Sequence, residues 1–362
     1  TAVADSTGGG AFTLHALNGC QVDISGDAYY LFVESELPPD SGSFDGYGTV
    51  TRHENGFLLT SPYEIPPETV DKLRAAPGVS SLRAAEPVFY PIRGRALYKD
   101  GREMIEYARE RGISLGEAAL EYESALLDMP KDKLDREMER RLSVMEHAVA
   151  LGLSDDSPRM SLLAPTAKDI MAAEAAGKLA LGGIHTRAAA RAMAAMQVNS
   201  GQGIVCAAPT GGSAGVLPGV VVTMLDDLKI PRADVVRAMW AAGAAGWVLG
   251  EHGTFAAEVC GCQVEIGAAG AMGAAAVVEM AGGSAAQCCD AAAVMFQNAM
   301  GLVCDLVQAT VEIPCHTRNA SFASQAFVCA DLVLGGYHNP VGIDCTVEAV
   351  CASGRMLPCE LR

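Results

Sequence analysis

Three long stretches rich in alanine and glycine limit the folds open to this chain. They lie near residues 202–225, 235–250 and 266–286, and they carry few charges. Pro209, Pro218 and many glycines interrupt them, and they contain little of the leucine and isoleucine typical of membrane spans. Alanine and glycine at this density instead predict buried helices whose backbones approach closely, because such small side chains leave little space between two helices.

The first 93 residues follow a different pattern from the rest. Short runs of β-forming residues alternate with clusters of glycine, proline, aspartate and serine. The expected strands are Ala11–Leu17, Tyr29–Val33, Gly56–Thr60 and Val88–Tyr90, and the expected helix is Pro66–Ala75, with Pro67 in its first turn. We therefore expect residues 1–93 to form a small α+β region.

From residue 94 onward the pattern is helical. Apolar residues recur at spacings of three and four positions, with charged residues between them. The first expected helices are Asp100–Arg111, Ser114–Leu127, Lys131–Leu151 and Pro165–Leu181. The fold class is thus α+β: a small N-terminal α+β region is followed by a large, mainly helical domain at residues 94–362, with a central buried layer.

Charge and cysteine content narrow the class of protein. The net charge of −17 argues against a nucleic-acid or anionic-membrane partner, since both require a basic surface. The chain has twelve cysteines, but it is too long for a small disulfide scaffold and opens without a hydrophobic signal segment. We therefore expect a cytoplasmic protein with reduced thiols, most of them small buried apolar groups.

Three cysteines differ from the others by their surroundings. Cys262 lies in Cys-Gly-Cys-Gln-Val-Glu-Ile-Gly, Cys304 precedes an aspartate, and Cys315 lies in Ile-Pro-Cys-His-Thr-Arg-Asn. Their spacing matches neither a ferredoxin nor a zinc ribbon. Three thiolates that leave one position open are suited to a [4Fe–4S] cluster in which one iron binds substrate as a Lewis acid. The sequence therefore predicts a cluster-binding domain.

A second unusual segment contains Thr210, Gly211, Gly212 and Ser213 ahead of an apolar helix. Successive backbone N–H groups beside hydroxyls can form a nest for a small anion such as a substrate carboxylate. The alternative is an ordinary helix N-cap with glycines in a tight turn. No Gly-Lys-Ser/Thr follows, so the segment is not a Walker P-loop.

Polar residues near these segments are candidates for catalysis or binding. His185 and His316 are candidate bases, although a histidine near a helix start can equally be a cap; His338 lies in a turn and is a weaker candidate. Arg318 can clamp a carboxylate or form a salt bridge. Glu265 can pair with Arg318 or orient a ligand.

These motifs together resemble the α-subunit of the iron–sulfur-dependent L-serine dehydratases. The resemblance rests on Gly203–Gly219, Gly261–Gly267, Gly301–Asp305 and Ile313–Asn319, and it extends from about Tyr98 to the C-terminus. Residues 5–35 resemble the later part of the β-subunit of that family. The family converts L-serine to pyruvate and ammonia, in amino-acid degradation and gluconeogenesis.

The resemblance implies roles for particular residues. Cys262, Cys304 and Cys315 match the ligands of the [4Fe–4S] cluster. The segment next to the substrate is matched by Thr210, Gly211, Gly212 and Ser213, and we add Arg318 and Asn319 as substrate-binding residues. The family uses a histidine from its β-portion, before the point where this chain begins, so we expect a β-subunit or upstream domain as partner; Cys359 is a candidate cap for the fourth iron.

Two other functions remain open at this stage. One is a cluster-dependent lyase acting on a related β-substituted amino acid, cysteine or threonine. The other is a cluster-binding subunit that is inactive without a separate β-chain. In each case we expect a homo-oligomer, a small amino-acid substrate, and neither nucleic acid nor membrane as partner.

Overall fold

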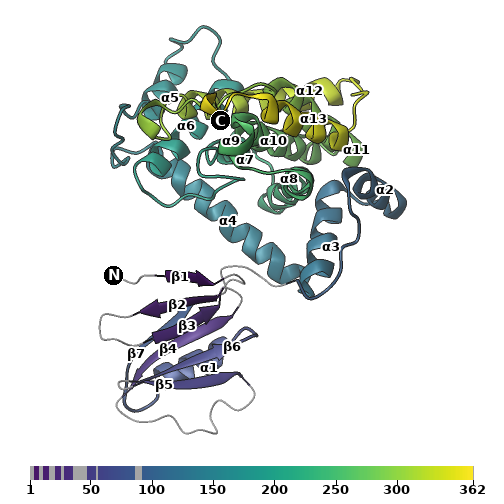
Figure 1. Cartoon of the computed structure of the whole chain (residues 1–362). Helices are drawn as coiled ribbons and strands as arrows, with labels where there is room; N and C mark the ends of the chain where they lie inside the picture. The colour runs from purple at the N-terminus through teal and green to yellow at the C-terminus, as the bar shows by residue number, and fades with distance from the viewer. Residues whose placement is uncertain are drawn as a thin grey trace. The chain divides into compact units, whose positions relative to one another are not determined.

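The computed structural model of the chain confirms an α+β fold, with every described strand in the first 85 residues (Figure 1). It describes residues 4–7, 11–15, 21–25, 28–35, 47–53, 56–85 and 92–361, the first three ranges by their backbone alone. The chain divides into two compact units, Thr1–Arg93 (unit 1) and Gly94–Arg362 (unit 2).

Unit 1 contains two antiparallel sheets. The first has three strands in the order β1-β2-β3, and the second has four in the order β5-β6-β4-β7. The elements are β1 (Ala4–Thr7), β2 (Ala11–His15), β3 (Gln21–Ser25), β4 (Tyr29–Ser35), β5 (Thr49–His53), β6 (Gly56–Ser61), α1 (Pro67–Arg74) and β7 (Val79–Ala85). Strands β2, β4 and β6 and helix α1 confirm four predictions, whereas the predicted strand Val88–Tyr90 lies outside the described residues.

The core of unit 1 lies between the four-stranded sheet and α1. Alternate residues of β4 point to opposite faces, and Leu31 pairs in register with Leu59 of β6. Both are buried, together with Val33, Phe57 and Ile65, and Val70 of α1 packs against them. Tyr30 and Leu58 are buried in a second cluster, so this strand pair is apolar on both faces.

Unit 2 is helical throughout its described length, apart from loops and short 3₁₀ turns. Its elements are α2 (Gly101–Arg111), α3 (Leu115–Leu127), α4 (Lys131–Gly152), α5 (Ala167–Ala175), α6 (Ile184–Ser200), α7 (Val216–Asp226), α8 (Arg232–His252), α9 (Ala257–Cys260), η2 (Cys262–Val264), α10 (Ile266–Met280), α11 (Ala285–Ala299), η3 (Val307–Ala309), α12 (Cys315–Leu334), α13 (Ile343–Met356) and η4 (Cys359–Leu361).

Local sequence accounts for several of the helix ends. Ser114 caps α3 in a reciprocal capping box with Glu117, and Asp100 accepts a hydrogen bond from the N–H of Glu103 at the start of α2. The prediction of one helix over Pro165–Leu181 was wrong in its second half. Helix α5 stops at Ala175 because Gly177 adopts a left-handed conformation, with φ of 65°, and its N–H bonds back to Glu174.

Helix α10 forms the centre of unit 2. All its residues except the last, Met280, are buried, and it packs against α8, α11 and α12. Glycine permits this close packing: a Cβ on Gly270 would lie 2.9 Å from side-chain atoms of Met295 and Phe322. The stretches at 235–250 and 266–286 thus supply helices of the predicted buried layer. The prediction for 202–225 was wrong in its first half, which is loop and turn up to residue 215.

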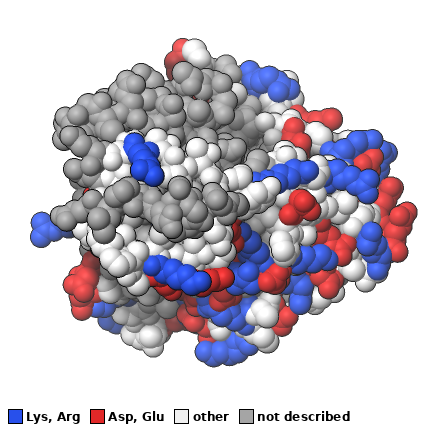
Figure 2. Space-filling view, turned by 90° about the horizontal axis from the view of Figure 1, so that it is seen from below, with Lys and Arg blue, Asp and Glu red and all other residues white. Residues whose placement is uncertain are grey.

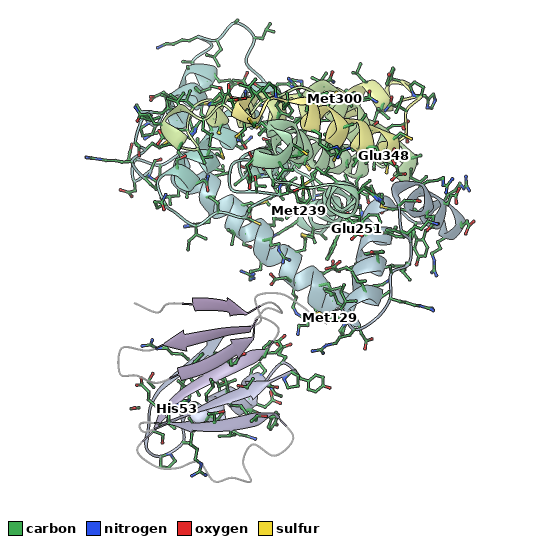
Figure 3. The ribbon with its side chains drawn as sticks, viewed as in Figure 1. His53, Met129, Met239, Glu251, Met300 and Glu348 are labelled. Carbon is green, nitrogen blue, oxygen red and sulfur yellow. The ribbon has the colours of Figure 1, made fainter. Side chains whose placement is uncertain are left out.

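The outer surface of unit 2 carries charges of both signs. Lys and Arg side chains are interspersed with Asp and Glu side chains on the face drawn in Figure 2. On α4, for example, the exposed side chains of Arg136 and Asp132 form an ion pair. Glu348 of α13 is exposed, whereas Met239 of α8 is buried (Figure 3). None of the described helices is both long and apolar enough to cross a membrane.

Candidate functional site

The three predicted cysteines lie in neighbouring loops and helix starts of unit 2. Cys262 begins η2 and Cys315 begins α12; both are buried, whereas Cys304, in the loop after α11, is partly exposed. All three are free thiols. They are near enough to interact electrostatically: burial, then Cys262 and Glu265, raise the pKa of Cys315 to about 12, and Cys304 adds to the rise.

A buried glutamine joins the segments that carry Cys262 and Cys304. The side chain of Gln263 donates to the carbonyl oxygen of Cys260 at 2.8 Å and accepts the N–H of Gly301 at 3.0 Å. Gly261 allows the two segments to meet, because a Cβ there would lie 2.6 Å from the carbonyl oxygen of Leu302. Sequence reasoning gave Gln263 no role; its position beside Cys262 was the available signal.

The Cys304 loop is also held by Arg318. Its guanidinium donates to the carbonyl oxygen of Val303 at 2.9 Å and pairs with Asp305 at 2.8 Å. Of the alternatives that the sequence left open, a carboxylate clamp or a salt bridge, the structure shows the salt bridge. The main-chain N–H of Cys304 donates to the carbonyl oxygen of Leu361, so η4 lies against this cysteine, with Cys359 exposed.

Thr210, Gly211, Gly212 and Ser213 form a turn ahead of α7. The N–H of Thr210 donates to the Ser213 hydroxyl at 3.3 Å. The N–H groups of Gly211, Gly212 and Ser213 make no hydrogen bond to any described residue. Helix α7 itself begins at Val216, and no side chain of the turn caps it at Gly215. The turn therefore presents unused N–H groups, as an anion-binding nest requires.

Asn319 fixes this turn against α12. Its Oδ1 accepts the N–H groups of Gly215 and Val216 at 2.9 and 3.1 Å, and its Nδ2 donates to the carbonyl oxygens of Gly212 and Cys315, both at 2.8 Å. The residue is fully buried. The expectation that its side chain binds substrate is corrected: each of its polar atoms is already bonded within the protein.

Ser213 is corrected in the same way. Its side chain is fully buried, and its hydroxyl lies 3.0 Å from that of Thr210. The hydroxyl therefore supports the turn, and the N–H groups that a ligand can reach are those of Gly211, which is exposed, and Gly212, which is partly exposed.

Glu265 connects the turn to the cysteines. It accepts a hydrogen bond from the hydroxyl of Thr210, and its other oxygen lies 4.0 Å from the sulfur of Cys262. A Cβ on Gly212 would lie 2.5 Å from the carboxylate, so only glycine lets the turn approach it this closely. Burial raises the pKa of Glu265, and the hydrogen bond from Thr210 opposes the rise.

The three histidines considered as bases are either buried or lie apart from this group. His185 is exposed and contacts Ser324, which lies nine residues, or about 13 Å, along α12 from Cys315. His316 is next to Cys315 but only 1% exposed; its Nδ1 faces the carbonyl oxygen of Glu312, and its Nε2 has no hydrogen-bond partner among the described residues. Burial lowers the pKa of His316. His338 is exposed near Asp290, outside this group.

Sequence reasoning also missed Glu312, three residues before Cys315. Its buried carboxylate accepts the N–H groups of Ser161, Leu162 and Leu163 at 2.7, 2.8 and 2.8 Å. These bonds fasten the loop between α4 and α5 to the start of α12. No nearby sequence signal marks the pairing, because about 150 residues separate the partners.

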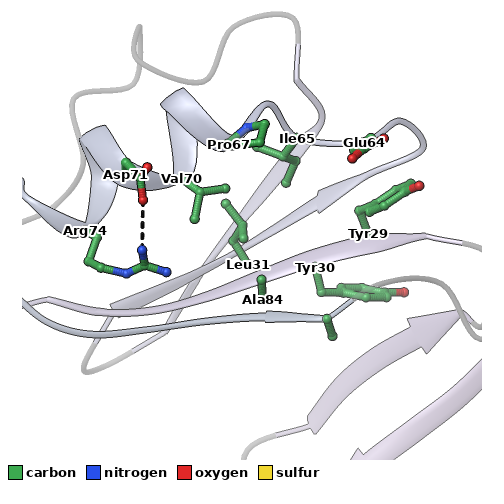
Figure 4. Close-up of a pocket in the computed structure, with 11 residues that line it drawn as sticks. Tyr29, Tyr30, Leu31, Glu64, Ile65, Pro67, Val70, Asp71, Arg74 and Ala84 are labelled. Atoms are coloured by element: carbon green, nitrogen blue, oxygen red, sulfur yellow. Dashed lines mark hydrogen bonds and ion pairs between the residues drawn. The ribbon is translucent and has the colours of Figure 1, made fainter. Parts of the chain in front are cut away.

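Two hollows of the described structure lie away from this group. One, of about 310 Å³, lies between α1 and the sheet of unit 1, where Arg74 and Asp71 pair with each other (Figure 4). The other, of about 420 Å³, is lined by residues of α3, α4 and α8, including Trp240. Among the described residues, no three His, Cys, Asp or Glu side chains converge as ligands of a single metal ion.

Comparison with known proteins identifies the relatives of this chain. The model of the family described as "Serine dehydratase alpha chain" matches residues 110–362. The "Probable L-serine dehydratase, alpha chain" of Bacillus subtilis is 35% identical over 266 residues, which cover 74% of this chain and 89% of that protein. For the "L-serine dehydratase, alpha chain" of Peptoniphilus asaccharolyticus the identity is 33% over 256 residues, 70% and 87% of the two chains.

A longer relative matches more of this chain. The "L-serine dehydratase 1" of Escherichia coli is 26% identical over 346 residues, which cover 91% of this chain and 74% of that protein. The match therefore includes part of unit 1 as well as unit 2.

Proposed function

Because this chain belongs to the serine dehydratase alpha chain family, we propose that it is an L-serine ammonia-lyase that converts L-serine to pyruvate and ammonia. The observation that carries the proposal is the bond between Thr210 and Glu265, beside Cys262. It joins a turn with unused N–H groups to a set of free thiols, which supports a carboxylate-binding role for the turn beside candidate metal ligands.

We further propose that Cys262, Cys304 and Cys315 hold a [4Fe–4S] cluster. The donor set supports this: the three thiols are free, and Arg318 opposes the rise in pKa of each of them. Thiolates that bind different irons of a cluster need not converge on one point, as the ligands of a single ion must. When bound, such a cluster with one open iron would supply a Lewis acid for the hydroxyl group of the substrate.

The protein groups have separate tasks in this proposal. The N–H groups of Gly211 and Gly212 bind the substrate carboxylate, while the buried Ser213 and Asn319 hold the turn in place. Loss of the β-hydroxyl and of the Cα proton converts L-serine into 2-aminoacrylate and water. Tautomerisation to the imine and addition of water then give pyruvate and ammonia.

The base for the Cα proton is proposed to come from a β-chain or an upstream domain. None of His185, His316 and His338 is placed as an accessible base among the described residues, and relatives of this chain are named alpha chains. The chain alone should then hold its cluster, bind serine and turn over slowly. Addition of the β-chain or upstream domain should then raise the turnover rate.

The test is anaerobic reconstitution with iron and sulfide, followed by parallel assays on L-serine, L-threonine and L-cysteine. Each assay is run with and without the β-chain or upstream domain of a relative. We expect about four irons and four sulfides per chain, the composition of the cluster, and highest turnover with serine. Zinc without sulfide would contradict the cluster. A clear preference for cysteine or threonine would show that serine is not the main substrate. Full turnover by the chain alone, if a single His→Ala substitution abolishes it, would contradict an external base.

A further inference from the structure

Glu265 is a partly buried carboxylate that lacks a cationic partner. No Lys, Arg or His nitrogen of the described residues lies within 4 Å of its oxygens, although Arg318 is nearby and pairs with Asp305 instead. Burial of a carboxylate without a counter-charge is unfavourable, and native proteins usually provide a cation or several hydrogen bonds. Among the described residues, the side chain of Glu265 accepts one hydrogen bond from the hydroxyl of Thr210 and a long one, at 4.0 Å, from the thiol of Cys262. Neither donor carries a positive charge.

The surroundings of Glu265 supply little positive charge. Its neighbours are the uncharged thiols of Cys262, Cys304 and Cys315 and the carboxylate of Glu258, while Arg318 acts on it from beyond 4 Å. Glu265 also occupies the N-cap position of α10, a helix of 15 residues, where the helix dipole stabilises a negative charge. The position of this carboxylate, beside the turn and without a cation in contact, is therefore complementary to a small cation from outside the chain.

The geometry of the turn limits where such a cation can lie. One carboxylate oxygen is held by Thr210 and lies against Gly212; the other faces Cys262. The unused N–H groups thus belong to Gly212, which lies against the carboxylate, and to its neighbour in the chain, Gly211. A ligand that binds both the N–H groups and the carboxylate needs an anionic group and a cationic group close together. An α-amino acid has this arrangement, because its carboxylate and its ammonium group are both attached to Cα.

We propose that Glu265 binds the α-ammonium group of the substrate and so makes the site specific for amino acids over hydroxy acids. The inference rests on the proposed function, since it places the substrate carboxylate on the turn at residues 210–213. The β-hydroxyl then points towards the cysteines. Neither neighbouring carboxylate fits the role as well: Asp305 is paired with Arg318, and Glu258 is exposed.

The consequence is a site that rejects serine analogues without an amino group. 3-Hydroxypropanoate has the carboxylate and the hydroxyl of serine but no ammonium group, so it would leave Glu265 without a partner. A site built around a buried polar group discriminates strongly against a ligand that fails to pair with it. The wild-type protein should therefore bind serine at least tenfold more tightly than 3-hydroxypropanoate.

The test uses Glu265→Gln in the reconstituted protein, with affinities for both compounds measured by anaerobic calorimetry. Loss of a charge-assisted hydrogen bond corresponds to roughly a ten- to hundredfold weaker affinity for serine. The affinity for 3-hydroxypropanoate should change less than threefold, and iron and sulfide content should stay at the wild-type value. Glu258→Gln, which removes one nearby exposed charge, should leave both affinities unchanged. Glu265→Asp, which keeps the charge, should restore part of the preference for serine.

Three results would overturn the inference. Equal weakening of both ligands in Glu265→Gln would show that the carboxylate only positions the turn. Loss of iron in this variant, with an unchanged helical circular dichroism spectrum, would show that Glu265 supports the cluster and does not bind the substrate ammonium group. Failure of the wild-type protein with a full cluster to bind either compound would overturn the proposed function itself, and this is seen before any variant is compared.

Discussion

The side chain of Asn319 accepts the main-chain N–H of Gly215 at 2.9 Å, across 104 positions of sequence. On the preceding turn of the same helix lies Cys315, whose carbonyl oxygen accepts a hydrogen bond from Asn319. One amide group therefore fixes a candidate cluster ligand and the candidate substrate turn relative to each other. The two halves of the site cannot move independently while this amide is in place.

Asn319→Ala should consequently damage both halves of the site. It leaves the N–H groups of Gly215 and Val216 buried without an acceptor, at a cost of about 1–3 kcal/mol of folding free energy for each unsatisfied group. We expect a lower midpoint of chemical unfolding, less bound iron and weaker serine binding. Ser321→Ala, at an exposed position of the same helix, is the control. Unchanged unfolding of Asn319→Ala would show that water replaces the amide.

Cys304→Ala should remove most of the bound iron from the reconstituted protein. If the cluster has three protein ligands, loss of one leaves two of its irons without a protein thiolate. Iron and sulfide are measured after desalting under anaerobic conditions. Cys345, exposed on α13, provides the matched control, and its alanine variant should retain a full complement. Full iron content in Cys304→Ala would remove this residue from the ligand set.

Glu312→Gln should lower stability, and the loss should depend on pH. Burial alone would raise the pKa of Glu312, but the N–H groups of Leu162, Ser161 and Leu163 outweigh burial and hold it below the usual value. A carboxyl whose pKa is lower in the folded state stabilises the fold above its unfolded pKa of about 4.3, and this contribution is lost as pH falls through the folded pKa.

We therefore expect wild type to exceed Glu312→Gln in unfolding free energy by roughly 1.5–3 kcal/mol at pH 7, from the bonds to the charged group. The gap should narrow as pH falls below about 4. Urea unfolding of both proteins across this range measures it, with Glu348→Gln, at an exposed position, as the control. A gap that is constant with pH would show that the charge of Glu312 does not matter.

The fold class and the main helices could be predicted because their signals are local. Ser114 and Asp100 cap helices within four residues of sequence, and the composition of residues 266–286 indicated a buried helix. The end of α5 was missed, although Gly177 carried a signal for it. The edge strand β5 gave no clear pattern, since its exposed and partly exposed residues do not form an apolar run.

The candidate site residues that could be predicted are those whose residue type or local sequence alone suggests a function. Cysteines and an N–H-rich turn stand out in any sequence, and the structure places them as neighbours. The roles of Asn319, Glu312 and Gln263 were not predictable, because each depends on partners that are 38 to 151 positions away. His185 had the right residue type but lies near the opposite end of α6 from Asn199, which holds the turn.

Gly212→Ala tests whether the close approach of the turn to Glu265 matters for binding. The new methyl group would lie 2.5 Å from the carboxylate and must displace either Glu265 or the turn. Gly243→Ala, at an exposed position of α8 where a new methyl group meets nothing within 4 Å, is the control. We expect serine affinity to fall at least tenfold in Gly212→Ala, as for loss of a charge-assisted bond, and to change little in Gly243→Ala. Equal affinities in the two variants would show that substrate does not use the space between Gly212 and Glu265, since only one of them disturbs it.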